Sequence, residues 1–120
     1  MRLAFTYNPV PDVEEALSFY RDTLGWTEAW RHGDHTVAFT IPGTNVQFMV
    51  GPRVAGEQPG PAFLVDSVER FYAEHRDRLT FVAKPRAIPG GHWASFLDPA
   101  GHPVYLLDQV PEQLPQRISA

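Results

Sequence analysis

The stretch FLDPAGHPVYLLD (residues 96–108) places an Asp-Pro-Ala-Gly turn between two apolar runs. Aspartate, proline and glycine are residues that tight turns prefer, and Asp98 is expected to stabilise this turn by accepting a hydrogen bond from nearby backbone. Apolar and polar residues alternate on either side of the turn, as they do in strands with one buried face. The stretch is therefore predicted to be the last β-hairpin of a folded unit.

A similar pattern occurs in the first half of the chain. GTNVQFM aligns with GHPVYLL at a constant offset of 58 residues, which places Gln47 opposite Tyr105. VPDVEE and VDSVER each open a segment with the features of a capped helix, and aligning the first strands of the two halves places Phe5 opposite Gly60. These matches predict an internal repeat.

Each half is predicted to contain a strand, a helix and three further strands. The turn and breaker residues that separate the apolar runs set the boundaries. The predicted strands are residues 3–10, 26–32, 35–41 and 45–50 in the first half and residues 62–65, 81–88, 92–97 and 103–109 in the second.

The two predicted helices span residues 11–26 and 66–79. Asp12 and Glu15 form the capping pair of the first helix, and Asp66 and Glu69 that of the second. Gly25 ends the first helix. The apolar stripes are Val13, Leu17, Tyr20 and Leu24 on the first helix and Val68, Phe71, Tyr72, His75 and Leu79 on the second.

The chain of 120 residues is expected to form one domain. Module one covers about residues 2–50, and a linker rich in glycine and proline covers about residues 51–60. Module two covers about residues 61–109, and a polar tail with scattered apolar residues covers residues 110–120.

Composition excludes several classes of function. The chain has no cysteine, so disulfides, thiolate metal sites and cysteine nucleophiles are absent. A formal net charge of -4, with Lys84 as the only lysine, argues against nucleic acid as a partner. No apolar run is long enough to span a bilayer, and the N-terminus does not resemble a signal peptide, so a cytoplasmic protein without membrane contact is expected.

The paired βαβββ modules, the FYRDTLGW end of the first helix and the FLDPAGHPVYLLD hairpin closely resemble the vicinal oxygen chelate superfamily. That superfamily includes glyoxalase I, extradiol dioxygenases, fosfomycin resistance proteins and bleomycin-binding proteins. The resemblance covers about residues 2–109. It implies an α+β fold in which two βαβββ modules form a curved mixed sheet around a cleft. One such scaffold hosts several chemistries, so the fold alone does not assign a function.

The resemblance also implies four functional positions, one in the first and one in the last strand of each module. In the metal enzymes of the family these positions hold oxygen or nitrogen ligands. Carried over to this chain they are Phe5, Gln47, Gly60 (or Pro61) and Tyr105. Only Gln47 offers a suitable oxygen, and a neutral amide alone binds hard cations weakly. We therefore expect no metal site and no other cofactor.

The concave face of the sheet is predicted to bind a small ligand instead. Because side chains alternate along a strand, Phe5 in the cleft implies that Leu3 and Tyr7 face it too, and Gln47 there implies Asn45 and Met49. His92 follows two glycines that could form a flap over the pocket. The predicted ligand-binding residues are Phe5, Tyr7, Gln47, Met49, His92, Trp93, Ser95, Tyr105 and Leu107. In the alternative interpretation the aromatic residues simply fill the cleft.

These observations favour a metal-free binding protein of the bleomycin-resistance type that sequesters an aromatic or apolar ligand. The alternative is an isomerase, lyase or dioxygenase with an atypical site, in which a tyrosine hydroxyl or His92 supplies a proton and Gln47 orients an oxygen. No catalytic residue is assigned. A homodimer is expected because the open sheet and the tail residues Val110, Leu114 and Ile118 need cover, and the modules could pair within one chain or swap between two.

Overall fold

The computed structural model describes residues 1–33, 35–54 and 56–108. The strands are β1 (Arg2–Val10), β2 (Glu28–His32), β3 (Thr36–Thr40), β4 (Gln47–Pro52), β5 (Gly60–Leu64), β6 (Thr80–Phe81), β7 (Arg86–Ile88), β8 (Gly91–Leu97) and β9 (Pro103–Leu107). The helical segments are α1 (Val13–Leu17), its π-helical continuation η1 (Ser18–Thr23) and α2 (Val68–His75). None of the helices in the described part of the chain is long and apolar enough to cross a membrane.

The strands form one mixed sheet in the order β2-β3-β4-β1-β5-β9-β8-β6, with β7 also paired to β8. In each module the first and last strands are parallel neighbours, β1 with β4 and β5 with β9. The two modules join where β1 pairs with β5 in antiparallel orientation, within the same chain. The predicted α+β fold with two βαβββ modules is confirmed.

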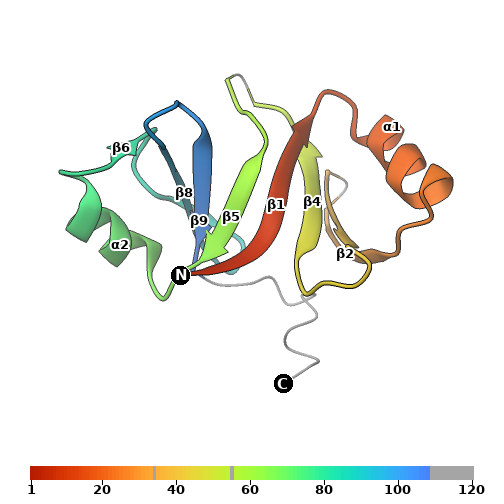
Figure 1. Cartoon of the computed structure of the whole chain (residues 1–120), viewed down its shortest axis with the longest axis horizontal. Helices are drawn as coiled ribbons and strands as arrows, with labels where there is room; N and C mark the ends of the chain where they lie inside the picture. The colour runs from red at the N-terminus through yellow and green to blue at the C-terminus, as the bar shows by residue number, and fades with distance from the viewer. Residues whose placement is uncertain (34, 55, 109–120) are drawn as a thin grey trace.

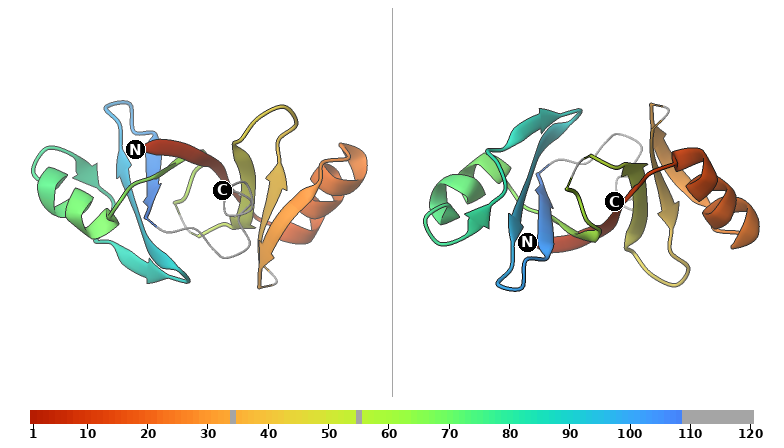
Figure 2. Two further views of the ribbon diagram at one scale, coloured as in Figure 1. Left: turned by 90° about the horizontal axis from the view of Figure 1, so that it is seen from below. Right: turned by 90° about the horizontal axis from the view of Figure 1, so that it is seen from above.

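The two helices lie at opposite ends of the molecule, with β1 and β5 between them (Figure 1). Seen from below or above, the two half-sheets face each other and α1 and α2 cover their outer faces (Figure 2). Apolar clusters fill both helix–sheet interfaces. The buried residues are Leu17, Val37, Phe39 and Val50 beneath α1, and Val68, Ala94 and Leu106 beneath α2. A third cluster lies on the inner face of the sheet.

The helix starts follow local capping chemistry, with one change from the prediction. Asp12 caps α1 as expected, since its side chain accepts a hydrogen bond from the Glu15 amide at 3.1 Å. At α2 the cap is Ser67, whose hydroxyl accepts from the Arg70 amide at 3.1 Å, so the prediction of Asp66 was wrong by one residue. Serine and aspartate are nearly equivalent caps, and sequence alone does not distinguish adjacent candidates.

The end of the first helix departs from the predicted apolar stripe. In η1 the amide of Leu24 donates to the carbonyl of Phe19, five residues back, at 2.9 Å. This wider turn shifts the following residues around the helix axis. Leu24 is consequently 48% exposed, and Trp26 packs against the cluster beneath α1 instead.

The strand predicted over residues 81–88 is divided into β6 and β7, both antiparallel to β8. Pro85 lies between them and has no amide hydrogen to donate to a ladder, which is one reason for the break. The final hairpin forms as predicted: Asp98 accepts hydrogen bonds from the amides of Ala100 at 2.9 Å and His102 at 2.8 Å. The predicted tail, residues 110–120, lies outside the described residues, as does Gln109, the last residue predicted for module two.

Candidate ligand cleft on the concave face

The inner face of the curved sheet carries a packed cluster drawn from both modules. Its buried members are Ala4, Phe5, Trp30, Ala38, Met49, Ala62, Trp93, Tyr105 and Leu107. Tyr7, Ala29, Leu64 and Ile88 pack against them at its edge. The cluster therefore fills much of the space between the half-sheets, in line with the alternative that the aromatic residues pack the cleft.

Three aromatic rings from different strands, Tyr7 of β1, Trp93 of β8 and Tyr105 of β9, meet on the inner face of the sheet. The ring centroids of Tyr7 are 5.3 Å from Trp93 and 5.0 Å from Tyr105, both in edge-to-face orientation. Trp93 and Tyr105 are 5.3 Å apart and tilted by 30°. These distances are in the range of favourable aromatic pairs. The trio fixes the positions of the two tyrosines.

Both tyrosine hydroxyls are held by the connector between the modules. Tyr7 donates to Oε1 of Glu57 at 3.1 Å, and the amide of Val54 donates to the same oxygen at 3.3 Å. Tyr105 donates to the carbonyl of Gln58 at 2.6 Å. The connector is therefore tied to the cleft at two points rather than being a free linker.

Burial and the nearby Glu57 carboxylate raise the pKa of Tyr7 well above its ordinary value. Burial, followed by the charge of Glu57, also raises the pKa of Tyr105. Both hydroxyls therefore stay protonated at neutral pH. They can donate hydrogen bonds but are poor general bases there.

On the module-one side, Gln47 is committed to a neighbouring side chain. Its Oε1 accepts a hydrogen bond from the indole Nε1 of Trp30 at 2.8 Å, and both residues are buried. The Trp30 ring also lies edge-on to Phe5, with centroids 6.0 Å apart. Gln47 thus completes the buried hydrogen bonding of Trp30 and does not present a free oxygen to the cleft.

Strand register corrects one of the four family positions. Phe5 pairs with Gln47 between β1 and β4, and the equivalent pair between β5 and β9 is Ala62 with Tyr105. Ala62, not Gly60 or Pro61, therefore corresponds to Phe5. Gly60 is instead a close-packing position, because a Cβ there would lie 2.5 Å from the carbonyl oxygen of Pro103.

The resulting set of side chains does not suit a metal ion. Phe5 and Ala62 have no donor atom, Gln47 is engaged by Trp30, and the Tyr105 hydroxyl donates to a backbone carbonyl. Divalent cations need several oxygen or nitrogen ligands. Within the described part of the chain, no group of three or more His, Asp or Glu side chains is placed to hold an ion elsewhere.

Beside the packed cluster lie a smaller and a larger hollow that described residues line. The smaller has a volume of about 240 Å³ and lies between the modules; it is lined by Tyr7, Trp30, His32, Thr36, Met49, Arg86, Ile88, Pro89, Trp93 and Leu107. The larger, of about 750 Å³, runs between the connector, the β6–β7 segment and the inner face of β8 and β9. Trp93 and Arg86 belong to both.

Six of the nine predicted site residues line these hollows. Tyr7, Met49, Trp93 and Leu107 line the smaller, and Trp93, Ser95 and Tyr105 line the larger. Phe5 and Gln47 lie on the same face, buried in or beside the packed cluster. Their binding roles stay predictions. Sequence reasoning missed Trp30, Thr36, Arg86 and Ile88, although the alternation rule applied to β2, β3 and β7 could have found them.

His92 lies on the opposite face of the sheet, against α2. Its Nδ1 is 3.2 Å from Oδ2 of Asp108, and its amide donates to Oδ1 of the same carboxylate at 2.9 Å. Asp108 also accepts from the amide of Val68 at the start of α2, at 3.0 Å. The expected placement of His92 over the pocket was wrong, because its neighbour Trp93 takes the inner face. Pro89 and Gly90 form the turn between β7 and β8, and Pro89 reaches the smaller hollow.

A bulge in β1 changes the predicted face of Leu3. The register with β5 shifts between Leu3 and Phe5, so Ala4 joins the inner cluster. Leu3 pairs with Phe63, a residue of the α2 side, and is 39% exposed. Asn45 precedes β4 and is exposed rather than lining the cleft. Strict alternation fails at bulges and beyond strand ends.

Solved structures with the same fold come from several bacteria. A protein described as an NAD-dependent benzaldehyde dehydrogenase from Legionella pneumophila is 14% identical, with a TM-score of 0.72 and coverage of 88% of this chain and 98% of that one. Methylmalonyl-CoA epimerase from Mycobacterium tuberculosis is 18% identical, with a TM-score of 0.61 and coverage of 99% and 92%. A glyoxalase/bleomycin resistance protein/dioxygenase superfamily member from Vibrio splendidus 12B01 is 17% identical, with a TM-score of 0.60 and coverage of 91% and 98%. At these identities the likeness shows the fold alone.

No curated protein matches the chain in sequence. The family profile, in contrast, matches nearly all of the two modules, over residues 2–106. Together with the paired βαβββ modules and the inner cleft, this match shows that the chain belongs to the Glyoxalase/Bleomycin resistance protein/Dioxygenase superfamily.

Proposed function

We propose that this chain is a metal-free binding protein that sequesters a small aromatic or apolar ligand in its concave cleft. The observation that carries the proposal is the smaller hollow of about 240 Å³, whose walls come from both modules. Aromatic and aliphatic side chains form most of its surface, and a few polar groups lie at its edge, which is the usual composition of a small-molecule site.

The size of the hollow limits the ligand. Drug-sized molecules occupy pockets of roughly 300–1,000 Å³, whereas an apolar cavity of about 150 Å³ accommodates benzene. A volume of about 240 Å³ therefore suits a compound with one ring and a short substituent. Trp93 and Tyr7 offer ring faces and edges to such a compound.

The enzyme alternative has less support from the arrangement of groups. Gln47, which was to orient an oxygen, is hydrogen-bonded to Trp30, and His92 lies on the outer face. The tyrosine hydroxyls donate to Glu57 and Gln58 and have raised pKa values. Among the described residues that line the hollow, no acid and base are thus positioned together.

The test combines metal analysis with ligand titration. Elemental analysis of purified protein should give no stoichiometric Zn, Ni, Fe or Mn. Toluene, phenol and indole should raise the melting temperature in a concentration-dependent way, because a ligand that binds only the folded state stabilises it by mass action.

Matched variants locate the binding. Ile88→Trp should fill the smaller hollow and abolish the thermal shift, whereas Val82→Trp narrows only the larger hollow and should leave the shift intact. A stoichiometric metal, or a thermal shift that persists in Ile88→Trp and disappears in Val82→Trp, would contradict the proposal.

We also propose that the chain forms a homodimer and acts in the cytoplasm. The outer edge of β2 has no partner strand among the described residues, and β6 is the other end of the sheet. Exposed strand edges favour pairing with another chain.

A further inference from the structure

Arg86 lies at the junction of the two hollows. It belongs to β7 and pairs across the ladder with Trp93 of β8, so both side chains lie on the inner face of the sheet. Its positive charge acts on Tyr7, where it favours the ionised form and so opposes the effects that raise the pKa of the hydroxyl. The guanidinium is therefore close to the aromatic trio while remaining exposed to solvent.

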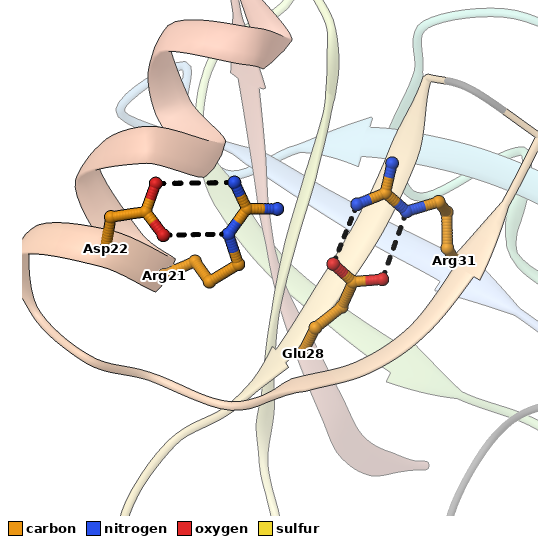
Figure 3. A network of polar contacts seen from close by, with 4 residues as sticks. All are labelled: Arg21, Asp22, Glu28 and Arg31. Carbon is orange, nitrogen blue, oxygen red and sulfur yellow. Dashed lines mark hydrogen bonds and ion pairs between the residues drawn. The ribbon is translucent and has the colours of Figure 1, made fainter.

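The environment of Arg86 differs from that of two other arginines. Arg21 contacts Asp22 at 3.0 and 3.3 Å, and Arg31 contacts Glu28 at 3.0 and 2.7 Å, each through two nitrogens (Figure 3). Arg86 makes no hydrogen bond or ion pair with residues 1–33, 35–54 or 56–108. Its planar set of donors is available to an external acceptor.

The smaller hollow has a marked charge asymmetry. Arg86, His32, Thr36 and the hydroxyl of Tyr7 are polar groups along it, and none of the described residues that line it is Asp or Glu. Glu57 lines only the larger hollow, where its Oε1 already accepts from Tyr7 and Val54. An anionic group at the edge of the smaller hollow would thus meet donors and, in the part of its lining that the structure describes, no carboxylate.

We infer that the ligand of the smaller hollow is a single-ring aromatic anion, with a carboxylate as the simplest case, and that Arg86 binds its charged group. The inference rests on the proposed function and adds the chemical class of ligand. The ring lies among Tyr7, Trp93 and the aliphatic side chains, and the anion lies toward Arg86 at the open edge. A guanidinium suits this role because it forms two parallel hydrogen bonds with a carboxylate.

The experiment compares acids with their neutral amides. Benzoate, phenylacetate and 3-phenylpropionate are titrated against the full chain at low salt, in parallel with the corresponding primary amides and toluene. NMR shifts of the protein's backbone amides and tryptophan indoles report both the affinity and the location of binding, since Trp30 and Trp93 line the hollow. The variants are Arg86→Gln, Arg86→Lys and, as a control, Arg53→Gln, which removes an exposed arginine that lines neither hollow.

We expect the best acid to bind wild-type protein about tenfold or more tightly than its amide, as a charge-assisted hydrogen bond allows. Arg86→Gln should reduce this ratio to about one, Arg86→Lys should retain part of it, and Arg53→Gln should not change it. High salt should weaken the acid more than the amide.

The role of Arg86 would be overturned if acid and amide bound with equal affinity, or if the ratio of their affinities were unchanged in Arg86→Gln. Binding of toluene and the amides would still support the proposed function in that case. Acid binding that shifts resonances along the larger hollow instead would also overturn it. If acids, amides and toluene all fail to shift the resonances of the smaller hollow, the proposed function falls as well.

Discussion

Truncation of Tyr105 to alanine should strongly destabilise the fold. The residue is only 3% exposed, its ring packs against Tyr7 and Trp93, and its hydroxyl donates to the Gln58 carbonyl at 2.6 Å. Removing a large buried aromatic side chain costs about 3–5 kcal/mol. Each aromatic pair contributes about 0.5–1.5 kcal/mol of that figure. We therefore expect a loss of about 3–5 kcal/mol in the free energy of unfolding.

The hydroxyl can be separated from the ring. Tyr105→Phe keeps the ring and removes the hydrogen bond to Gln58, so it should cost about 1 kcal/mol. Tyr72→Phe is the matched control, because the Tyr72 hydroxyl makes no hydrogen bond with the described residues, and it should be neutral. Urea unfolding followed by circular dichroism gives the free energies, with thermal melting as a second measurement.

A stable Tyr105→Ala variant would refute this account of the cleft. If its free energy of unfolding stays within about 0.5 kcal/mol of wild type, the ring is not part of a packed cluster. The inner face would then be open, and the prediction that Tyr105 binds a ligand would gain support. Equal losses in Tyr105→Phe and Tyr105→Ala would assign the stability to the hydrogen bond rather than the ring.

Three further predictions concern packing, pH and assembly. Gly60→Ala should cost about 1–3 kcal/mol in urea unfolding, because its Cβ would lie 2.5 Å from the Pro103 carbonyl oxygen, whereas Gly51→Ala meets Tyr7 at 3.5 Å and should be tolerated; equal stabilities would contradict the packing of β5 on β9. The raised pKa of Tyr7 means that the unfolded chain ionises first, so stability should be complete below the ordinary pKa of 10.0 and fall as pH rises above it. Tyr7→Phe should flatten this alkaline decline, and an identical decline in the variant would assign it to other groups. Light scattering at micromolar concentration should give twice the chain mass of 13.5 kDa; a single monomeric mass that ligand does not change would refute the homodimer.

Much of the fold was predictable because its signals are local. The Asp98 turn, the Asp12 cap and the strand alternation each depend on a few neighbouring residues, and the repeat added evidence for the helix starts and for the last strand of each module. The misplaced features are those in which local signals compete. Asp66 and Ser67 are both suitable N-cap residues. The helical period changes in η1, and no residue type in that segment predicts the change.

The make-up of the cleft was decided by tertiary structure, since pairing register and bulges determine which side of a sheet each residue faces. The bulge between Leu3 and Phe5 turned Leu3 away from the inner face. The pairing of Ala62 with Tyr105 showed that Ala62, not Gly60, is the residue equivalent to Phe5. Arg86 reached the cleft through its pairing with Trp93, a contact between two strands. The sequence thus determined the elements and their order, and the contacts among distant strands determined which side chains meet in the site.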